Sequence, residues 1–326
     1  MKKKPDRGDI ALQPILDAVV AEVRKAAPKL YREAVSQAKA RKKSPPAKAD
    51  FERFGIAVFT REGELFSAGN AGSSFPLQSI AKVFALEIAL EALGEKLWAR
   101  VGREPSGDPF SSIIDLERDK GIPRNPFINP GALVVCDVLA GLSGSGRRAG
   151  QVGAFLKTMI EAKSIKLDPG VMKSDRTGGN LNRSHMYMAK HHGNLHHPVE
   201  AVMDVYKENC AIRLDCRGLA RAGRFLMQEG GLPGRGQAAA RRARRILSIM
   251  MLCGQYDAAG DFAYRVGLPA KSGVGGGILA IAPQRASIAV WSPALDPMGN
   301  SVLGTLGLEL LSDKTDWSVF GTIRSQ

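Results

Sequence analysis

The sequence predicts an α+β protein in which strands from both ends of the chain form one antiparallel sheet, flanked by helices and joined to a central helical subdomain. β-rich runs with turn signals occur at residues 54–68 and 275–291, whereas residues 114–260 have mostly helical periodicity interrupted by glycines. Strands distant in sequence can pair in one sheet while the chain between them folds as a helical lobe. A pocket at the seam between the lobes is the natural place for a ligand.

The first 50 residues are expected to form a basic helical segment and a linker. Apolar side chains recur at helical spacing along residues 9–40. Residues 41–50 are strongly charged and contain a Pro-Pro pair, which is typical of a loop. The remainder, residues 51–326, is expected to be one domain with a sheet lobe (51–78 and 265–326) and a mostly helical lobe (79–264).

The first hairpin is predicted at residues 54–60 and 64–68, because two β-rich runs flank a short Arg-Glu-Gly turn. An apolar-rich helix follows, beginning at Ser79 and continuing to Leu93, where Gly94 ends it. Six further helices are expected between glycine-rich breaks, at residues 134–142, 150–162, 183–191, 199–208, 217–229 and 241–252.

The end of the chain returns to β character. Residues 275–281 and 286–291 are rich in apolar side chains and flank a Pro-Gln turn, so they predict a second pair of strands. A final helix is expected at residues 301–312, after Asn300.

The chain of 326 residues carries a formal net charge of +14, with basic clusters in residues 1–48 and 235–245. Nucleic acid is the obvious partner for such a charge. However, only 6% of the residues are aromatic, and the sequence has neither zinc-ligand spacing nor a recognition-helix pattern. Solvated basic faces are therefore the favoured interpretation, and a nucleic-acid partner is not expected.

The four cysteines, Cys136, Cys210, Cys216 and Cys253, form no Cys-x-x-Cys motif. Their spacing argues against a zinc site, and their apolar neighbours are typical of reduced core cysteines. No signal-type apolar core follows the basic N-terminus directly, and no apolar run reaches the length of about 18 residues that spans a membrane. The sequence therefore predicts a soluble, cytoplasmic protein without a membrane partner.

Candidate chemistry begins with Ser79 and Lys82, which form a Ser-x-x-Lys motif at the start of the predicted helix. At this spacing the two side chains project from the same helix face. A lysine whose pKa is lowered by burial can take the proton of a serine hydroxyl and make the serine nucleophilic. The motif supplies the nucleophile in serine β-lactamases and penicillin-binding proteins. Alone it is weak evidence, because a helix cap followed by a solvated lysine has the same pattern.

Further motifs occur in order along the chain, and residues 266–278 (VGLPAKSGVGGGI) are the longest and most unusual in composition. The others are residues 75–84, 125–132 (NPFINPGA), 182–183, 206–210, 253–260 (CGQYDAAG), 291–293 and 299–301. With the Ser-x-x-Lys motif they resemble the serine-dependent glutaminases of bacteria, from about Ala26 to Leu311. This resemblance implies a β-lactamase/transpeptidase-like fold.

The resemblance also implies the roles of individual residues. Ser79 would be the nucleophile, Lys82 its base and Tyr256 part of the proton relay, with the N–H groups of Ser79 and Val274 as the oxyanion hole. The substrate would be contacted by Ser79, Asn129, Asp175, Asn182, Tyr206, Tyr256 and Val274. Tyr206 would share in the relay.

Taken without the resemblance, several of these residues have ordinary explanations. Asn129 suits a tight turn, and Tyr206 and Tyr256 could be half-buried packing residues. The segment Lys271-Ser272-Gly273 resembles the Lys-Thr-Gly strand motif of penicillin-recognising enzymes, but it could equally be a strand with a glycine bulge.

The chain departs from the family pattern in four places. Asp175 stands where the family has a glutamate that binds the substrate ammonium, and residues 180–183 read Asn-Leu-Asn-Arg where the family has Asp-Arg-Asn-Arg. Residues 26–28 read Ala-Ala-Pro in place of Tyr-Ile-Pro, which removes an active-site phenol, and residues 41–49 look like an insertion. These departures bear on efficiency and on selectivity for glutamine.

The resemblance implies an amidohydrolase that converts L-glutamine to L-glutamate and ammonia through an acyl-enzyme, without metal or organic cofactor, and that assembles as a homodimer or homotetramer. One alternative is a related amidase with another substrate. A second is a weakly active family member that binds a partner such as nucleic acid through its basic N-terminal segment. A penicillin-binding activity is a third, weaker alternative.

Overall fold

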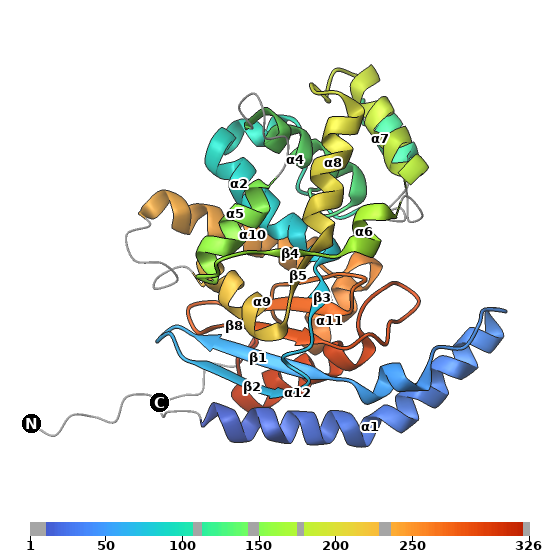
Figure 1. Cartoon of the computed structure of the whole chain (residues 1–326), viewed down its shortest axis with the longest axis vertical. Coiled ribbons are helices and arrows are strands. Elements are labelled where there is room, and N and C mark those ends of the chain that lie inside the picture. Colours follow the sequence, from blue (N-terminus) through green and yellow to red (C-terminus); the bar gives the residue numbers. More distant parts are fainter. Residues whose placement is uncertain (1–10, 107–112, 143–149, 175–178, 228–235, 322–326) are drawn as a thin grey trace, which may run out of the picture.

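The computed structural model describes residues 11–106, 113–142, 150–174, 179–227 and 236–321 (Figure 1). A helical lobe stands on a sheet lobe, and strands from both ends of the chain lie side by side in the sheet. The predicted α+β class with an antiparallel sheet is therefore confirmed.

The sheet has five strands: β1 (Gly55–Thr60), β2 (Leu65–Gly69), β6 (Ala270–Ser272), β7 (Gly277–Ala282) and β8 (Ala286–Trp291). Their order is β2-β1-β8-β7-β6, and every neighbouring pair is antiparallel. Both predicted hairpins are confirmed, and β1 pairs with β8 along its whole length. This pairing joins strands from the two ends of the chain in one sheet.

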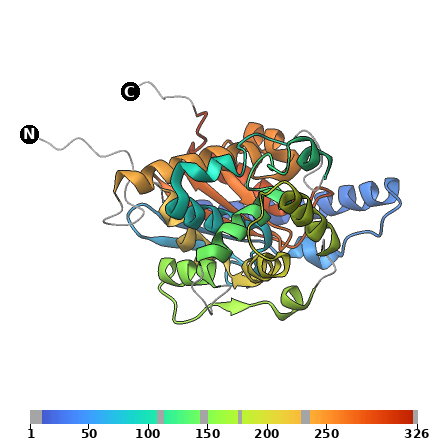
Figure 2. The same ribbon diagram turned by 90° about the horizontal axis from the view of Figure 1, so that it is seen from above.

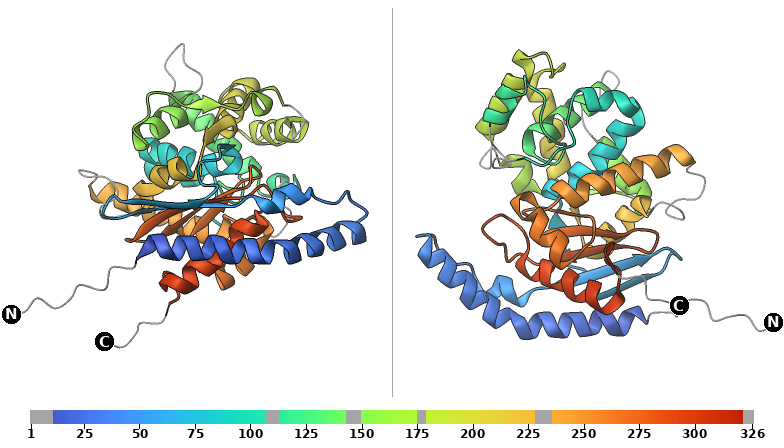
Figure 3. Two further views of the ribbon diagram at one scale, coloured as in Figure 1. Left: turned by 60° about the horizontal axis from the view of Figure 1, so that its bottom comes forward. Right: turned by 180° about the vertical axis from the view of Figure 1, so that it is seen from behind.

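The central strands are buried on both faces because helices cover the sheet from both sides. Helices α1 (Leu12–Ala40) and α12 (Val302–Thr315) lie together on one face (Figure 3). On the other face α9 (Cys216–Ala222) packs against β1 and β8. The helical lobe continues on that side.

Helix α1 belongs to the packing of the sheet along its first half. Leu16, Val19 and Val23 are fully buried in one hydrophobic cluster with Ile56 of β1 and Ile288 of β8. Beyond Pro28, within the helix, no residue of α1 is buried and this half projects from the sheet. The division of the chain at residue 50 stays a prediction. The hydrophobic cluster contains residues from both sides of this position.

The helical lobe is organised around α2 (Ala81–Leu93), whose side chains are buried on nearly all sides. Its neighbours include α4 (Asn129–Leu142), α5 (Gln151–Met159), α8 (Val199–Ala211) and α10 (Gln237–Cys253). Figure 2 shows the lobe from above. Shorter helices complete it: α3 (Ile114–Arg118), α6 (Pro169–Lys173), α7 (Gly179–His191) and α11 (Ala259–Arg265).

Several features differ from the sequence predictions. The helix expected to begin at Ser79 begins at Ala81, because Ser79 lies in a preceding 3₁₀ turn, and α3, α6 and α11 were not predicted. Helix α4 begins at Asn129 rather than residue 134, because Pro130 is compatible with a first helical turn. The helix expected at 217–229 is shorter: Asp215 caps α9, which ends at Ala222, and a 3₁₀ turn (Gly223–Leu226) follows. A small sheet of order β3-β5-β4 was not predicted; its strands are β3 (Phe75–Pro76), β4 (Lys166–Leu167) and β5 (Ile212–Leu214).

Within the described ranges, no helix combines the length and the apolar character needed to cross a membrane.

Candidate active site

Ser79 lies at the seam between the two lobes, in a 3₁₀ turn (Gln78–Ile80) that leads from β3 into α2. The small sheet fixes this turn, since the Leu77 N–H donates to the Ile212 carbonyl at 2.7 Å. Gln78 has a left-handed backbone with φ of 50°, which is unusual for a residue with a side chain. Such strain is held in place by surrounding structure and occurs often at functional sites.

The glycine-rich segment after β6 lets the backbone pass close to this turn. A Cβ atom at Gly275 would lie 2.2 Å from the Pro76 carbonyl oxygen, and one at Gly273 would lie 2.6 Å from that of Leu77. Only glycine fits at both positions. The sequence 273–277 therefore brings the backbone of Val274 beside Ser79.

Lys82 is in the first turn of α2 and only 5% exposed. Its Nζ donates to the Phe127 carbonyl at 3.1 Å and to Asn129 Oδ1 at 2.8 Å. Burial lowers the pKa of this amine from 10.5 to about 8, the main physical cause being loss of hydration of the charged form. Lys82 is thus a buried amine with access to its neutral form, not the solvated lysine of the alternative interpretation.

Asn129 connects Lys82 to two further polar side chains. Its Oδ1 also accepts from the Tyr206 hydroxyl at 3.4 Å, and its Nδ2 donates to Asn182 Oδ1 at 3.4 Å. Asn129 is the first residue of α4, Asn182 belongs to α7 and Tyr206 to α8, so three helices supply this polar wall. Asn129 is therefore not merely a turn residue.

Tyr256 faces Ser79 from the other side, within a 3₁₀ turn (Tyr256–Ala258). Burial raises the pKa of its phenol to about 12, although hydrogen bonds with the Ser79 and Ser272 hydroxyls oppose this shift. Its backbone φ is 51°, again in the left-handed region. The phenol is therefore protonated at neutral pH and within hydrogen-bonding reach of Ser79.

Lys271 lies in strand β6, which ends at Ser272, so the predicted strand is confirmed for these two residues, whereas Gly273 follows it. The Lys271 Nζ lies 4.4 Å from the centre of the Tyr256 ring and donates to the Gly254 and Ser272 carbonyls at 3.0 and 2.6 Å. Burial, and then the charge of Lys82, hold the pKa of Lys271 well below its usual value.

A pocket of about 590 Å³ opens in front of these groups. Val274, which is half exposed, lies at its edge. Lys82 lies behind this pocket and reaches it through Asn129. The predicted residues that line it are Ser79, Asn129, Asn182, Tyr206, Tyr256 and Val274. Asp175, the seventh predicted substrate contact, lies outside the described residues.

Two charged residues of the pocket were missed by the sequence analysis. Asp168 caps α6 through the Val171 N–H and pairs with Arg213. Lys207 follows Tyr206 in α8 and lies 3.8 Å from Asp204. The Asp-Pro-Gly start of α6 was a visible helix signal, whereas for Lys207 only its place beside Tyr206 could have indicated a role.

A serine hydroxyl and a phenol at one pocket, with a buried lysine three residues after the serine, are typical of serine-dependent acyl-transfer enzymes. Comparison with known proteins is more specific. The glutaminase family model matches residues 44–320, and this chain belongs to the glutaminase family.

Curated relatives cover most of the chain. A glutaminase of Agrobacterium fabrum is 51% identical over 279 residues, which are 84% of this chain and 90% of that protein. One of Methylobacterium radiotolerans is 50% identical over 279 residues, with the same two shares. A third, of Rhizobium rhizogenes, is 47% identical over 315 residues, or 95% of this chain and 99% of that protein.

Solved structures agree with this assignment. A probable glutaminase of Bacillus subtilis matches with a TM-score of 0.80 at 30% identity, covering 95% of this chain and 98% of that one. A Bacillus subtilis glutaminase in covalent complex with 5-oxo-L-norleucine, formed by reaction with 6-diazo-5-oxo-L-norleucine, matches with a TM-score of 0.75 at 28% identity. The shares covered are 95% of this chain and 100% of that one.

Proposed function

We propose that this protein hydrolyses L-glutamine to L-glutamate and ammonia through a covalent glutamyl-enzyme on Ser79. The proposal rests on the glutaminase family membership and on one observation of the site, the buried Lys82 amine beside the nucleophile. The covalent 5-oxo-L-norleucine complex of the Bacillus subtilis relative also supports a covalent reaction. We extend the proposal to the finer description of the fold as β-lactamase/transpeptidase-like.

The hydrogen bonds of Lys82 match those of a neutral amine. A neutral amine has two hydrogens and one lone pair, and here Lys82 donates to two oxygens, of Phe127 and Asn129. The lone pair is then available to the Ser79 hydroxyl at the other end of the motif. Burial lowers the pKa of Lys82 to about 8, so its neutral form is accessible near neutral pH.

The proposed reaction begins when Ser79 Oγ attacks the side-chain carboxamide carbon and Lys82, with Tyr256 in the relay, takes the hydroxyl proton. The N–H groups of Ser79 and Val274 stabilise the tetrahedral oxyanion. The C–N bond then breaks, and ammonia leaves with the proton that the relay returns. Water attacks the glutamyl ester, and its proton restores the Ser79 hydroxyl.

Substrate recognition is proposed to use the polar wall and the charges beside it. Asn129, Asn182 and Tyr206 offer hydrogen bonds, and Asp175 would pair with the α-ammonium group. Lys207, at the pocket, is a cation that suits the α-carboxylate. The shorter Asp175 favours one second candidate, an amidase of the same mechanism acting on a different amino-acid amide.

The test is ammonia release by the purified protein from L-glutamine, L-asparagine and simple amides. Ser79→Ala should abolish release from L-glutamine. Ser184→Ala, on the exposed face of α7, is the matched control and should keep it. Full turnover by Ser79→Ala would end the proposal, whereas Ser79-dependent release from another amide alone would select the second candidate.

Two further expectations are also proposals. We propose that the enzyme works as a homodimer or homotetramer, as the family resemblance suggests, and that it works in the cytoplasm. Sedimentation equilibrium of the full chain and cell fractionation test them. The expectation that the reaction uses no metal is checked by ammonia release after dialysis against a chelator, which should be unchanged.

A further inference from the structure

Arg213 is the central residue of the small sheet and is not among the described residues that line the active-site pocket. It belongs to β5, where its backbone pairs with Pro76 of β3 on one side and with Lys166 of β4 on the other. Strand β3 leads into the Ser79 turn, whereas β4 leads into α6. The small sheet therefore joins the turn that bears the nucleophile to the segment that contains α6.

The side chain of Arg213 joins the same two segments. Its guanidinium donates to the Ser74 carbonyl at 2.6 Å and to the Ser74 hydroxyl at 3.2 Å, directly before β3. It also pairs with the Asp168 carboxylate, which caps α6 by accepting from the Val171 N–H. That N–H, and then the guanidinium, hold the pKa of Asp168 below its usual value, so the pair is charged at neutral pH. A planar guanidinium holds several acceptors at once in a fixed geometry.

Both segments line the active-site pocket. Ser79 contributes from the turn. The lining residues from the segment that contains α6 are Asp168, Gly170, Val171 and Ser174. We call residues 168–174 the α6 wall. A ligand that contacts both Ser79 and the α6 wall binds well only when the separation between them is fixed.

The two segments differ in how they are anchored. Phe75 and Leu77, on the nucleophile side, are buried in one hydrophobic cluster with Phe84 of α2. On the other side, both residues of β4 are exposed and no residue of α6 is buried. Apolar packing therefore holds the Ser79 turn, whereas the α6 wall depends more on polar contacts such as the Arg213–Asp168 pair.

We propose that Arg213 is a positioning residue, which holds the α6 wall at the separation from Ser79 that the bound substrate requires. This role rests on the hydrolysis of L-glutamine proposed above. Arg213 acts through Asp168 and Ser74 and does not itself contact the substrate. Loss of the guanidinium should therefore weaken substrate binding and leave the chemistry at Ser79 largely unchanged.

The test is the steady-state kinetics of ammonia release from L-glutamine by the full-length protein. Arg213→Met keeps an apolar stem but removes every donor. We expect KM to rise about tenfold, as the loss of a charge-assisted hydrogen bond would cause, with kcat within about threefold of the wild type. A merely structural role would instead lower the stability and the amount of active enzyme, and would leave KM unchanged.

Asp168→Asn tests the other half of the pair. Asparagine also caps helices, so this variant keeps the cap of α6 and loses only the charge. It should raise KM by a similar factor, and the double variant with Arg213→Met should raise KM no further than the larger single effect. Asp168→Asn also decides the question if Arg213→Met fails to fold.

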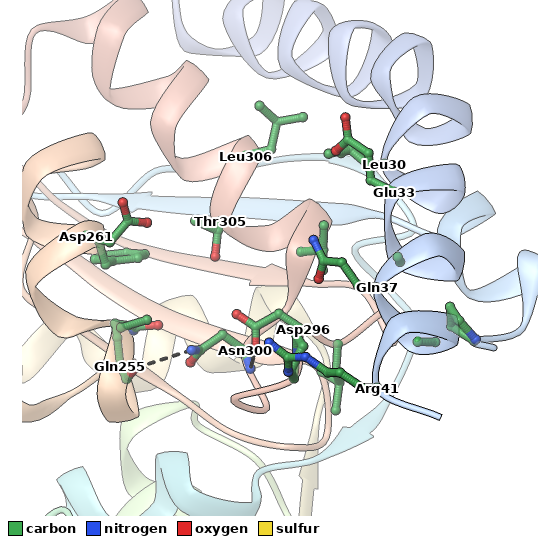
Figure 4. A pocket seen from close by; sticks show the side chains of 18 of the residues that line it. Leu30, Glu33, Gln37, Arg41, Gln255, Asp261, Asp296, Asn300, Thr305 and Leu306 are labelled. Atoms are coloured by element: carbon green, nitrogen blue, oxygen red, sulfur yellow. Dashed lines mark hydrogen bonds between the residues drawn. The ribbon is translucent and has the colours of Figure 1, made fainter. Parts of the chain in front are cut away.

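Arg265→Met is the matched control, because Arg265 also joins two elements through a partly exposed carboxylate pair, from α11 to Glu309 of α12. Arg265 borders a different pocket, between α1, α11 and α12 (Figure 4). That pocket shares no described lining residue with the active-site pocket. The control should therefore have the KM of the wild type.

A wild-type KM in both Arg213→Met and Asp168→Asn, or a loss of kcat alone, would overturn the role of Arg213. An equal rise of KM in Arg265→Met would overturn it too, as would a double variant in which the two single effects multiply. Failure of the proposed function is distinguishable, because the wild type itself would then release no ammonia from L-glutamine, and the role of Arg213 would fall with it.

Discussion

The chemistry of Lys82 depends on whether its amine carries two hydrogens or three. Its two acceptors, the Phe127 carbonyl and Asn129 Oδ1, pair with the two hydrogens of a neutral amine. The third hydrogen of the charged form would take the position on the nitrogen that the Ser79 hydroxyl needs. Burial supplies the driving force for deprotonation. The pKa of the Tyr256 phenol is raised rather than lowered, so the phenol stays protonated. In the proposed mechanism these two groups act as a base and an acid on either side of the Ser79 hydroxyl.

The pH dependence of turnover follows from this arrangement. In the proposed mechanism the neutral form of Lys82 is the base, and its population increases as the pH rises through the pKa of about 8. We therefore expect kcat/KM for L-glutamine to rise with pH and to level off above that value. Lys82→Arg, which cannot lose its proton, should reduce kcat by about 10²–10⁴-fold across the range. A flat profile through pH 8 in the wild type would contradict the role of Lys82.

Asp175 gives the second prediction at this scale, and it rests on the sequence. The family glutamate is longer by one methylene, and a misplacement of about 1 Å can cost roughly a hundredfold in rate. Asp175→Glu should therefore lower KM for L-glutamine and raise kcat/KM. Asp175→Asn is the control and should weaken binding. If the glutamate variant is less active on L-glutamine than the wild type, the pocket suits another substrate.

At the scale of elements, the active site depends on the contact between β3, the Ser79 turn and the glycines after β6. None of these elements is stable alone, since β3 has only two residues. The contact is possible because Gly275 and Gly273 leave room for the Pro76 and Leu77 carbonyls. Mutual support of this kind also explains why the left-handed backbone of Gln78 is retained.

Substitution of Gly275 tests this contact. A Cβ there would meet the Pro76 carbonyl at 2.2 Å, so Gly275→Ala should cost about 1–3 kcal/mol of unfolding free energy and reduce kcat by displacing the Ser79 turn. Gly153→Ala in α5, where a Cβ would meet nothing within 4 Å, is the control and should gain up to about 1 kcal/mol. Urea unfolding and ammonia release measure the two effects. If the two variants had the same unfolding free energy and the same rate of ammonia release, the role of the contact would be contradicted.

At the scale of the whole molecule, α1 completes the hydrophobic core beneath the sheet. The family model begins at residue 44, so α1 lies outside the matched region although its first half is buried and packs against β2 and α12. Leu16→Ala, at a fully buried position, should therefore lower the unfolding free energy by about 2–5 kcal/mol. Lys39→Ala in the exposed half should change it by less than about 0.5 kcal/mol. If both substitutions changed the unfolding free energy by similarly small amounts, α1 would not be part of the cooperative fold of the sheet.

Much of this architecture could be predicted because the chain has strong local signals. Both hairpins and α2 are marked by periodicity and turn residues, and the order of the motifs indicates which side chains meet at the pocket. Strands of two or three residues, such as β3 and β5, have no periodicity to detect. The left-handed backbone of Gln78 arises only from tertiary contacts, so no local pattern reports it.

Reaction with 6-diazo-5-oxo-L-norleucine tests the central claim most directly, because a Bacillus subtilis relative forms a covalent complex with this compound. Intact-mass spectrometry should reveal one 5-oxo-norleucine adduct per chain, and peptide sequencing should place it on Ser79. Ser79→Ala should remain unlabelled, whereas Ser184→Ala should be labelled like the wild type. An adduct on another residue, or undiminished labelling of Ser79→Ala, would contradict the assignment of Ser79 as the nucleophile.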